Sequence, residues 1–351
     1  MKQRRRLTKW LVVLLILHGI IAAAGFFAPY DPVEQDRERP YLPPMHIHMM
    51  DAHGHFHLRP FFYPLRLREG SFDQYEEDNA TAVALNFFTR GATYRLLGFV
   101  PSRIHLFGAA SARVYLLGSD AYGRDQLSRI LYGGQVSLLA GLLGTTVTLL
   151  LGALIGMAAG YFGGWRDDLL MRIAELFLAL PWLYLLFALR AFLPLSVSPL
   201  EAFLLVVVVI GMVGWARPAR LVRGVVLSIK ERDFVRAARG FGASDIYLLR
   251  RHILPETASV LLTQATILVP QFVLAEMTLS FLGLGVPEPM SSWGNLLATL
   301  QQYNVLVSYW WMYLPALAIV PFFLGYLSLA SALHERTSTY KIDEKSKWNL
   351  S

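Results

Sequence analysis

The sequence predicts an all-α polytopic membrane protein with six transmembrane helices and a small, mainly β extracytoplasmic insertion. Three observations lead to this fold class. The 351-residue chain is 55% hydrophobic, with a mean hydropathy of +0.43. Only 16% of its residues are charged, against about 25% in soluble proteins. Long apolar segments alternate with polar ones, and one long polar segment, residues 29–116, follows the first apolar segment.

The N-terminus is basic up to Lys9 and apolar from Trp10 to Ala28. A cleaved signal peptide begins in the same way. However, the apolar run is long, and Pro29 follows it without a strong small-residue cleavage pattern. We therefore expect residues 1–28 to form a cytoplasmic N-terminus and an uncleaved first transmembrane helix.

Residues 29–116 scatter Pro, His and charged residues among short aromatic runs, and none of their segments is apolar for long enough to cross a bilayer. We expect an extracytoplasmic insertion of strands and turns. Met45–Met50 and His55–Phe62 predict a hairpin with Gly54 at its turn. Five of the nine histidines of the chain lie in this hairpin: His46, His48, His53, His55 and His57.

These histidines allow two interpretations. Neutral imidazoles are common ligands of zinc, copper and nickel, so a metal site is one of them. The other is an aromatic-rich turn with solvated histidines. Because the sequence places no acidic cluster beside them, we expect no metal site and no cofactor.

Residues 117–334 are expected to form a core of five further spans, after an amphipathic approach over residues 118–132. The expected spans are Gln135–Gly160, Leu169–Leu193, Ala202–Trp215, Ser259–Leu282 and Ser308–Leu333. Lys and Arg concentrate in cytoplasmic loops. The connection Arg217–Arg251 carries nine of them, and Gly283–Val307 carries none. We therefore expect both termini, the tail 335–351 and the loop 217–255 to be cytoplasmic.

Small and polar residues inside the spans predict how the helices pack. Glycines recur on one span at spacings of three and four residues, which allows close helix contact in lipid. Prolines at 181, 270, 315 and 321 interrupt the spans and predict kinks. Glu175, Arg190 and Glu276 are ionisable at or near membrane depth, where such groups face protein or water. For Glu276 and Glu175 we expect a structural polar role or a place on a solute pathway.

The loop 217–255 contains a stretch that predicts a helix, a turn and a second helix. Asp233 is the expected cap of the first helix, and Gly242 suits the left-handed residue that ends it. Ser244 is the expected cap of the second helix, which carries Ile246, Leu249 and Ile253 on one face and stops near Pro255. Ala237 and Ala238 give the first helix a flat side. We expect this element to dock into a groove of another protein.

The same stretch resembles the coupling-loop motif of ABC importer permeases, Glu-Ala-Ala-x3-Gly-x9-Ile-x-Leu-Pro. The resemblance rests on Ala237-Ala238, Gly242 and His252-Ile253-Leu254-Pro255. Two positions depart from the motif: Arg236 replaces the usual Glu, and His252 stands at an Ile position. The blocks LGSDAYGRDQLSRILYGG (117–134), GYFGGW (160–165), AEMTLSFLGLG (275–285) and SWGN (292–295) are similar to the "C"-type subunit of dipeptide and oligopeptide permeases.

The resemblance implies a type I importer permease in the cytoplasmic membrane of a bacterium or archaeon. It implies four kinds of partner: a second permease subunit, two cytoplasmic ATP-binding subunits, an extracytoplasmic solute-binding protein and the lipid bilayer. Peptides are the implied solute, with nickel chelates and peptide-antibiotic-like solutes as alternatives. The residues implied to couple to the ATPase are Arg236, Ala237, Ala238, Gly242, Ala243, Ser244, Leu254 and Pro255.

Catalytic motifs are missing from the sequence. No lysine follows a glycine, so a P-loop cannot form, and His-Glu-x-x-His and Gly-x-Ser-x-Gly are absent. We expect a non-catalytic transport subunit whose energy comes from ATP hydrolysed on a partner, and no nucleic-acid binding. An ion-coupled secondary transporter is the alternative from another class, but it would show inverted repeats and paired acids near the midplane. A membrane enzyme using the histidines lacks the necessary acids.

Overall fold

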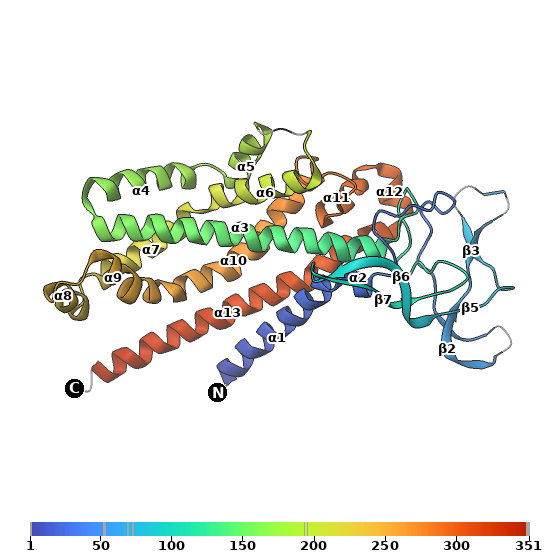
Figure 1. Ribbon diagram of the computed structural model, residues 1–351, viewed down its shortest axis with the longest axis horizontal. Coiled ribbons are helices and arrows are strands. Elements are labelled where there is room, and N and C mark those ends of the chain that lie inside the picture. Colours follow the sequence, from blue (N-terminus) through green and yellow to red (C-terminus); the bar gives the residue numbers. More distant parts are fainter. Residues whose placement is uncertain are drawn as a thin grey trace. The chain divides into compact units, whose positions relative to one another are not determined.

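The computed structural model describes residues 2–51, 54–68, 70–71, 74–192, 194 and 196–348 (Figure 1). The chain divides into two compact units. Unit 1 comprises Met1–Leu14, Leu138–Leu279 and Phe322–Ser351, and is helical. Unit 2 comprises Leu15–Ser137 and Ser280–Pro321, and contains all the described strands.

The helices follow the apolar pattern of the sequence, with more breaks than expected. The α-helices are α1 (Lys2–Ala22), α2 (Ala24–Phe27), α3 (Gln126–Phe162), α4 (Gly164–Ala179), α5 (Trp182–Ala191), α6 (Pro199–Gly214), α7 (Ala216–Ile229), α8 (Asp233–Gly240), α9 (Asp245–Leu248), α10 (Leu254–Phe281), α11 (Trp293–Ala298), α12 (Tyr303–Ser308) and α13 (Leu314–Trp348). A π-helical turn, η1 (Leu249–Ile253), joins α9 to α10, and η2 (Thr299–Gln301) and η3 (Trp310–Tyr313) are 3₁₀ turns.

Three helical stretches among the described residues are long and apolar enough to cross a membrane: Gln126–Phe162, Asp245–Phe281 and Trp310–Leu333. The number rises to five if each of two bent pairs is one span. These pairs are α4–α5, bent by 93°, and α6–α7, bent by 44°. Helix α1 is not among them, so the expected six spans remain a prediction. The end expected for the third span, Leu193, lies outside the described residues.

Prolines inside the expected spans differ in their effect. Pro181 does coincide with a break, because it caps α5 at the bend. Pro270 and Pro321 lie inside the continuous helices α10 and α13, so neither residue ends a helix and the kinks expected there stay a prediction. Helices in membrane proteins tolerate proline when their neighbours satisfy the freed carbonyl groups.

Glycines of α3 let the helices of unit 1 approach closely. A Cβ at Gly141 would lie 2.5 Å from Val273 on α10, and one at Gly156 would lie 2.4 Å from the carbonyl oxygen of Ala219 on α7. These distances are too short for any side chain, so close backbone packing accounts for the glycine spacing.

The strands of unit 2 form small antiparallel sheets. They are β1 (His48–Met50), β2 (Phe56–Phe62), β3 (Leu65–Leu67), β4 (Tyr75–Glu77), β5 (Val83–Ala84), β6 (Asn86–Leu96) and β7 (Val100–Gly108). The sheet orders are β1-β2-β5, β3-β4 and β6-β7. The predicted hairpin is present as β1–β2, with Gly54 at a φ of +83°. The main apolar cluster under these strands is small, with eight buried residues: Leu42, Met45, Phe62, Val83, Leu85, Phe107, Val114 and Tyr115.

Candidate functional site

The predicted helix–turn–helix of the loop 217–255 is present in unit 1. Helix α8 ends in a Schellman motif, in which Ala243 N donates to Ala238 O (3.1 Å) and Gly242 N donates to Arg239 O (3.0 Å). Gly242 has a φ of +84°, which disfavours every other residue. Ala238 and Ala243 pack in the same apolar cluster. The prediction for Gly242 is therefore confirmed in its geometry.

Ser244 caps α9 as expected, because its side chain accepts a hydrogen bond from Tyr247 N. Asp233 does not cap α8. It is the first helical residue, the N-cap is Arg232, and Asp233 instead places a negative charge in the first turn. Arg236 is exposed, and its guanidinium donates to the carboxylate of Glu231 at 2.5 Å.

The inner face of the second helix also differs from the expectation. Leu248 and Ile253 are fully buried, whereas Ile246 is 69% exposed. Pro255 does not stop the helix, which continues through the π turn η1 into α10. The π turn directly before Pro255, in which Leu254 N donates to Leu249 O, changes the hydrogen-bond pattern at the point where the proline lacks an N–H group.

Four contacts fix this element to the membrane helices of unit 1. Lys230 Nζ donates to Gly160 O at the end of α3 (2.9 Å), and Tyr161 Oη donates to Asp245 Oδ1 (2.5 Å). The Arg239 guanidinium lies 5.4 Å from the centre of the Tyr161 ring. Buried apolar residues of α3, α7, α8, α9 and η1 complete the attachment: Tyr161, Val222, Val226, Ile229, Val235, Leu248 and Ile253. These contacts join α8, α9 and η1 to α3 and α7.

The exposed side of this element carries large apolar side chains among charged ones. The exposed apolar residues of this element are Phe234, Ala237, Phe241, Ile246, Tyr247 and Leu254. Phe241 is 93% exposed. Exposed aromatic and aliphatic side chains gathered on one element are typical of protein interaction sites. We call these residues the docking face.

Glu175 lies near the loop rather than among apolar side chains. It lines a polar cavity of about 340 Å³ with Asp168, Met171, Arg172, Arg220 and Arg223. Beside it, the Arg223 guanidinium makes two parallel bonds to Asp167, of 2.5 and 2.6 Å. Such bidentate pairs are strong and directional. This pair joins α4 to α7 at the start of the loop.

A second cavity of about 340 Å³ lies at the breaks of both bent helix pairs. Its wall is mostly apolar, with Pro181 and Trp182 from the α4–α5 bend, and Arg217 and Gln271 add polar groups. Glu276 is fully buried in α10 and lines none of the described cavities. Its burial favours a structural role.

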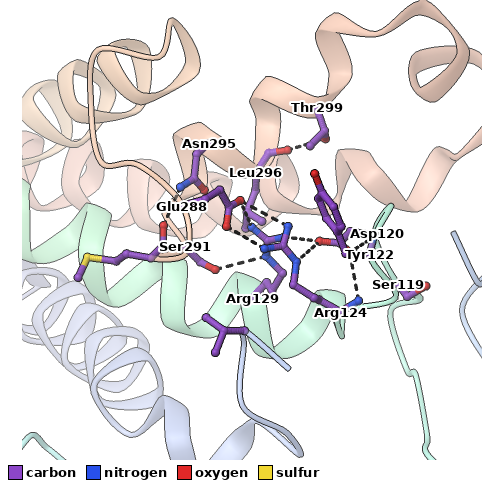
Figure 2. A network of polar contacts seen from close by, with 12 residues as sticks. Ser119, Asp120, Tyr122, Arg124, Arg129, Glu288, Ser291, Asn295, Leu296 and Thr299 are labelled. Carbon is purple, nitrogen blue, oxygen red and sulfur yellow. Dashed lines mark hydrogen bonds and ion pairs between the residues drawn. The ribbon is translucent and has the colours of Figure 1, made fainter. Parts of the chain in front are cut away.

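Unit 2 contains a network of charges, buried except for the half-exposed Glu288, that the motif blocks did not reveal (Figure 2). It consists of Asp120, Arg124, Arg129 and Glu288, which we call the arginine network. Arg124 Nε donates to Asp120 Oδ2 (2.7 Å), and Arg124 Nη1 donates to Glu288 Oε2 (2.8 Å). Arg129 donates to Glu288 Oε1 (2.6 Å) and also pairs with Asp120.

The arginine network ties the loop before α11 to the start of α3. Arg129 is only 1% exposed, and its Nε also reaches Ser291 Oγ at 3.3 Å. Trp293 is fully buried and donates to Ile130 O (2.9 Å). The blocks at 117–134 and 292–295 thus form one structural unit. Sequence reasoning missed it because the spacing of two blocks does not reveal which charges pair.

Asp125 precedes α3 and caps it, because its Oδ2 accepts bonds from Ser128 N (2.8 Å) and Ser128 Oγ (2.6 Å). Its other carboxylate oxygen has no hydrogen-bond partner within the described part of the chain. Burial raises the pKa of Asp125 to about 6. A carboxylate in this position is therefore partly desolvated and costs stability when it is charged.

The histidines of the β1–β2 hairpin have acidic neighbours, contrary to the expectation. Glu77 Oε1 lies 3.1 Å from His46 Nδ1 and 3.4 Å from His48 Nε2. Asp51 Oδ2 makes the same kind of pair with His55 Nδ1 (3.3 Å) and His57 Nε2 (3.0 Å). His53 lies outside the described residues. Among those described, no group of three or more His, Asp or Glu residues could hold a metal ion, and the absence of a metal site stays a prediction.

Comparison with known proteins places residues 152–339 in the family model of the binding-protein-dependent transport system inner membrane component. A provisionally named peptide transport system permease protein of Brucella suis biovar 1 (strain 1330) is 40% identical over 205 residues, or 58% of this chain and 67% of the relative. The dipeptide transport system permease protein DppC of Bacillus subtilis (strain 168) is 36% identical over 203 residues, or 58% of this chain and 61% of DppC. A crystal structure of an amino acid ABC transporter with histidines aligns with a TM-score of 0.43 and 19% identity, over 59% of this chain and 94% of that chain.

Proposed function

This chain belongs to the family of binding-protein-dependent transport system inner membrane components, and from this premise we propose that its solute is a peptide. We further propose that the loop 217–255 is the element that couples this chain to an ATPase. As a member of that family, it is a membrane permease subunit of an importer. The names of the relatives support a peptide as the solute, because these relatives are peptide and dipeptide permeases.

The exposed docking face is the observation that carries the coupling proposal. This chain has no P-loop, so ATP must be hydrolysed on separate subunits. Exposed apolar side chains such as Phe241, which is 93% exposed, are costly in water and suit a groove on such a subunit. The attachment of α8 and α9 to Tyr161 and Lys230 supports transmission of movement to the membrane helices. Closure of the ATPases would then switch the permease between inward- and outward-facing states.

The proposed assembly contains this chain, a second permease subunit, two ATP-binding subunits and an extracytoplasmic solute-binding protein. Each permease forms half of the translocation pathway. We assign the cavity at the α4–α5 and α6–α7 breaks to the solute pathway of this chain, because its wall combines apolar side chains with Arg217 and Gln271. A pathway for varied peptides needs apolar surface together with a few polar groups.

We propose six spans, with α1 and α2 as the first, and cytoplasmic termini. The basic residues of the loop 217–255 support this orientation. Because the chain has no cysteine, single introduced cysteines report it directly. Ser71→Cys in intact cells should react with a membrane-impermeant maleimide, and Ser244→Cys should not. The reverse labelling pattern contradicts the orientation.

Capture of the ATP-binding subunits tests the coupling proposal. Phe241→Glu places a charge in the docking face and should abolish co-purification of the ATPase with the permease. Tyr303→Glu is the matched control, because Tyr303 is 79% exposed on α12, far along the chain from the loop. Equal capture by both variants contradicts the assignment of the docking face, and absence of any ATPase from the wild-type complex contradicts the proposed assembly.

A further inference from the structure

The long hairpin β6–β7 lies outside the residues that match the family model. It ends in an apolar turn, residues 96–100, whose largest side chains are exposed. Leu97 is 58% exposed, Phe99 86% and Val100 58%. Gly98 has a φ of +82°, which makes the turn tight and projects its neighbours outward. Three large apolar side chains on one exposed turn are costly in water, so we expect a protein or lipid to cover them.

Contacts within unit 2 fix where this hairpin lies (Figure 1). Both of its strands pack on α2. His105 is 2% exposed, and its Nδ1 lies 2.6 Å from Ala28 O. Further toward the turn, the Tyr94 ring covers Gly25, where a Cβ would lie only 2.2 Å from the ring. The contacts therefore step from Ala28 back to Gly25, toward α1, as the hairpin approaches its turn.

This direction brings the turn to the end of α1. From Tyr94 to Leu97 the strand extends by about 10 Å, at about 3.3 Å per residue. Helix α1 presents Leu15 (74% exposed) and Ile16 (56% exposed) as apolar side chains without protein cover in this chain. A membrane-spanning helix presents such side chains to lipid. The turn therefore reaches the level at which the proposed first span leaves the bilayer.

The strands next to the turn are basic. Arg95 and Arg103 are exposed on β6 and β7, and Arg103 is held by a bond from its Nε to Thr93 Oγ1 (2.9 Å). An apolar tip with arginines behind it is complementary to a bilayer surface, in which acyl chains lie beneath phosphate groups. A docking site for a soluble protein would instead be surrounded by a rim of mixed polar groups.

We propose that residues 96–100 insert into the headgroup boundary of the outer leaflet, with Arg95 and Arg103 on lipid phosphates. The inference rests on the proposed first span, because α1 sets the position of the bilayer. The hairpin then anchors the strands of unit 2 against the membrane surface. This anchoring compensates for the small apolar core of these strands.

Spin labelling of the full chain in lipid nanodiscs tests the proposal. Nitroxides are attached to Phe99→Cys in the turn, to Leu58→Cys as a matched control and to Ile16→Cys as a depth reference. Leu58 is 91% exposed on β2, which lies in a different sheet. Collisions of each nitroxide with oxygen report lipid, and collisions with a water-soluble nickel complex report water.

The label at position 99 should collide several-fold more with oxygen, relative to the nickel complex, than the label at position 58. In anionic nanodiscs, Arg95→Gln together with Arg103→Gln should move it toward water. Two results overturn the inference. The first is water-like collisions at position 99. The second is shielding of this label from both reagents in the assembled transporter, because such shielding means that a protein covers the turn. The label at position 16 tests the first span independently of the label at position 99. A water-exposed label at position 16 contradicts the first span.

Discussion

Arg129→Met tests whether the arginine network holds the loop before α11 to the start of α3. The change removes one charge of a set of four that cancel, and leaves the carboxylates of Asp120 and Glu288 with only Arg124. The side chains of Arg129 and Asp120 are 1% and 3% exposed. Removal of one partner from a buried pair costs about 3–5 kcal/mol when the remaining charge is left unpaired; Asp120 keeps its bond to Arg124, so we expect a cost at the lower end of this range. Methionine fills much of the volume of the arginine stem, so lost packing contributes little.

The matched control is Arg66→Met, which breaks the pair with Glu76. That pair is exposed, with side-chain exposures of 64% and 43%, so its loss should cost about 0–1 kcal/mol. Intrinsic tryptophan fluorescence during heating of the purified full chain measures both variants. We expect a lower unfolding temperature for Arg129→Met and almost none of that change for Arg66→Met.

A double variant separates charge balance from packing. Arg129→Met with Glu288→Gln removes one positive and one negative charge, and should therefore unfold at a higher temperature than Arg129→Met alone. A double variant less stable than the single one refutes the reasoning about charge balance. An Arg129→Met variant that matches Arg66→Met refutes the buried network itself.

Two further changes test the local geometry. Gly242→Ala places a side chain at a φ of +84°, which costs about 1–2 kcal/mol and should lower capture of the ATPase. Gly240 is helical and has open space around it, so Gly240→Ala should raise the free energy of unfolding by about 0.5–1 kcal/mol and preserve capture of the ATPase. Equal effects of the two changes contradict the Schellman turn. Asp125→Asn should stabilise the protein by about 3 kcal/mol at pH 7.5. The folded pKa of Asp125 is about 6 against an ordinary value of 3.8, so at pH 7.5 the folded state holds a carboxylate that is costly to ionise. Thermal unfolding at pH 7.5 and pH 4 should show this gain shrinking, because at pH 4 the acid is protonated in the folded state, and a gain independent of pH contradicts the assigned cause.

Local patterns in the sequence predicted the two helices and the turn of the loop 217–255, but not the cap of the first helix or the end of the second. Gly242 and Ser244 have the predicted roles because a left-handed residue and a helix cap depend on their immediate neighbours. The spacing of Gly141 and Gly156 correctly predicted close helix packing. Gly54 occupies the turn of the predicted hairpin for the same local reason.

Features that depend on distant residues were not predictable. One acid beside the hairpin histidines, Glu77, lies far along the chain from His46 and His48. The other acid, Asp51, lies within the hairpin, and its pairing with His55 and His57 depends on how the turn folds back. The charge pairing of Arg129 with Glu288 likewise joins two separate blocks. The helix passes Pro255 through a π turn, whose residue Ile253 packs in a cluster with residues of α3 and α7.

Peptide-driven ATP hydrolysis in proteoliposomes tests the central claim most directly. The liposomes contain this chain, its second permease and the two ATP-binding subunits, and the solute-binding protein is added with a labelled peptide. We predict that the peptide accumulates only with ATP, and that Phe241→Glu abolishes uptake while Tyr303→Glu retains it. Uptake without ATP, or uptake by Phe241→Glu at the wild-type rate, contradicts the account.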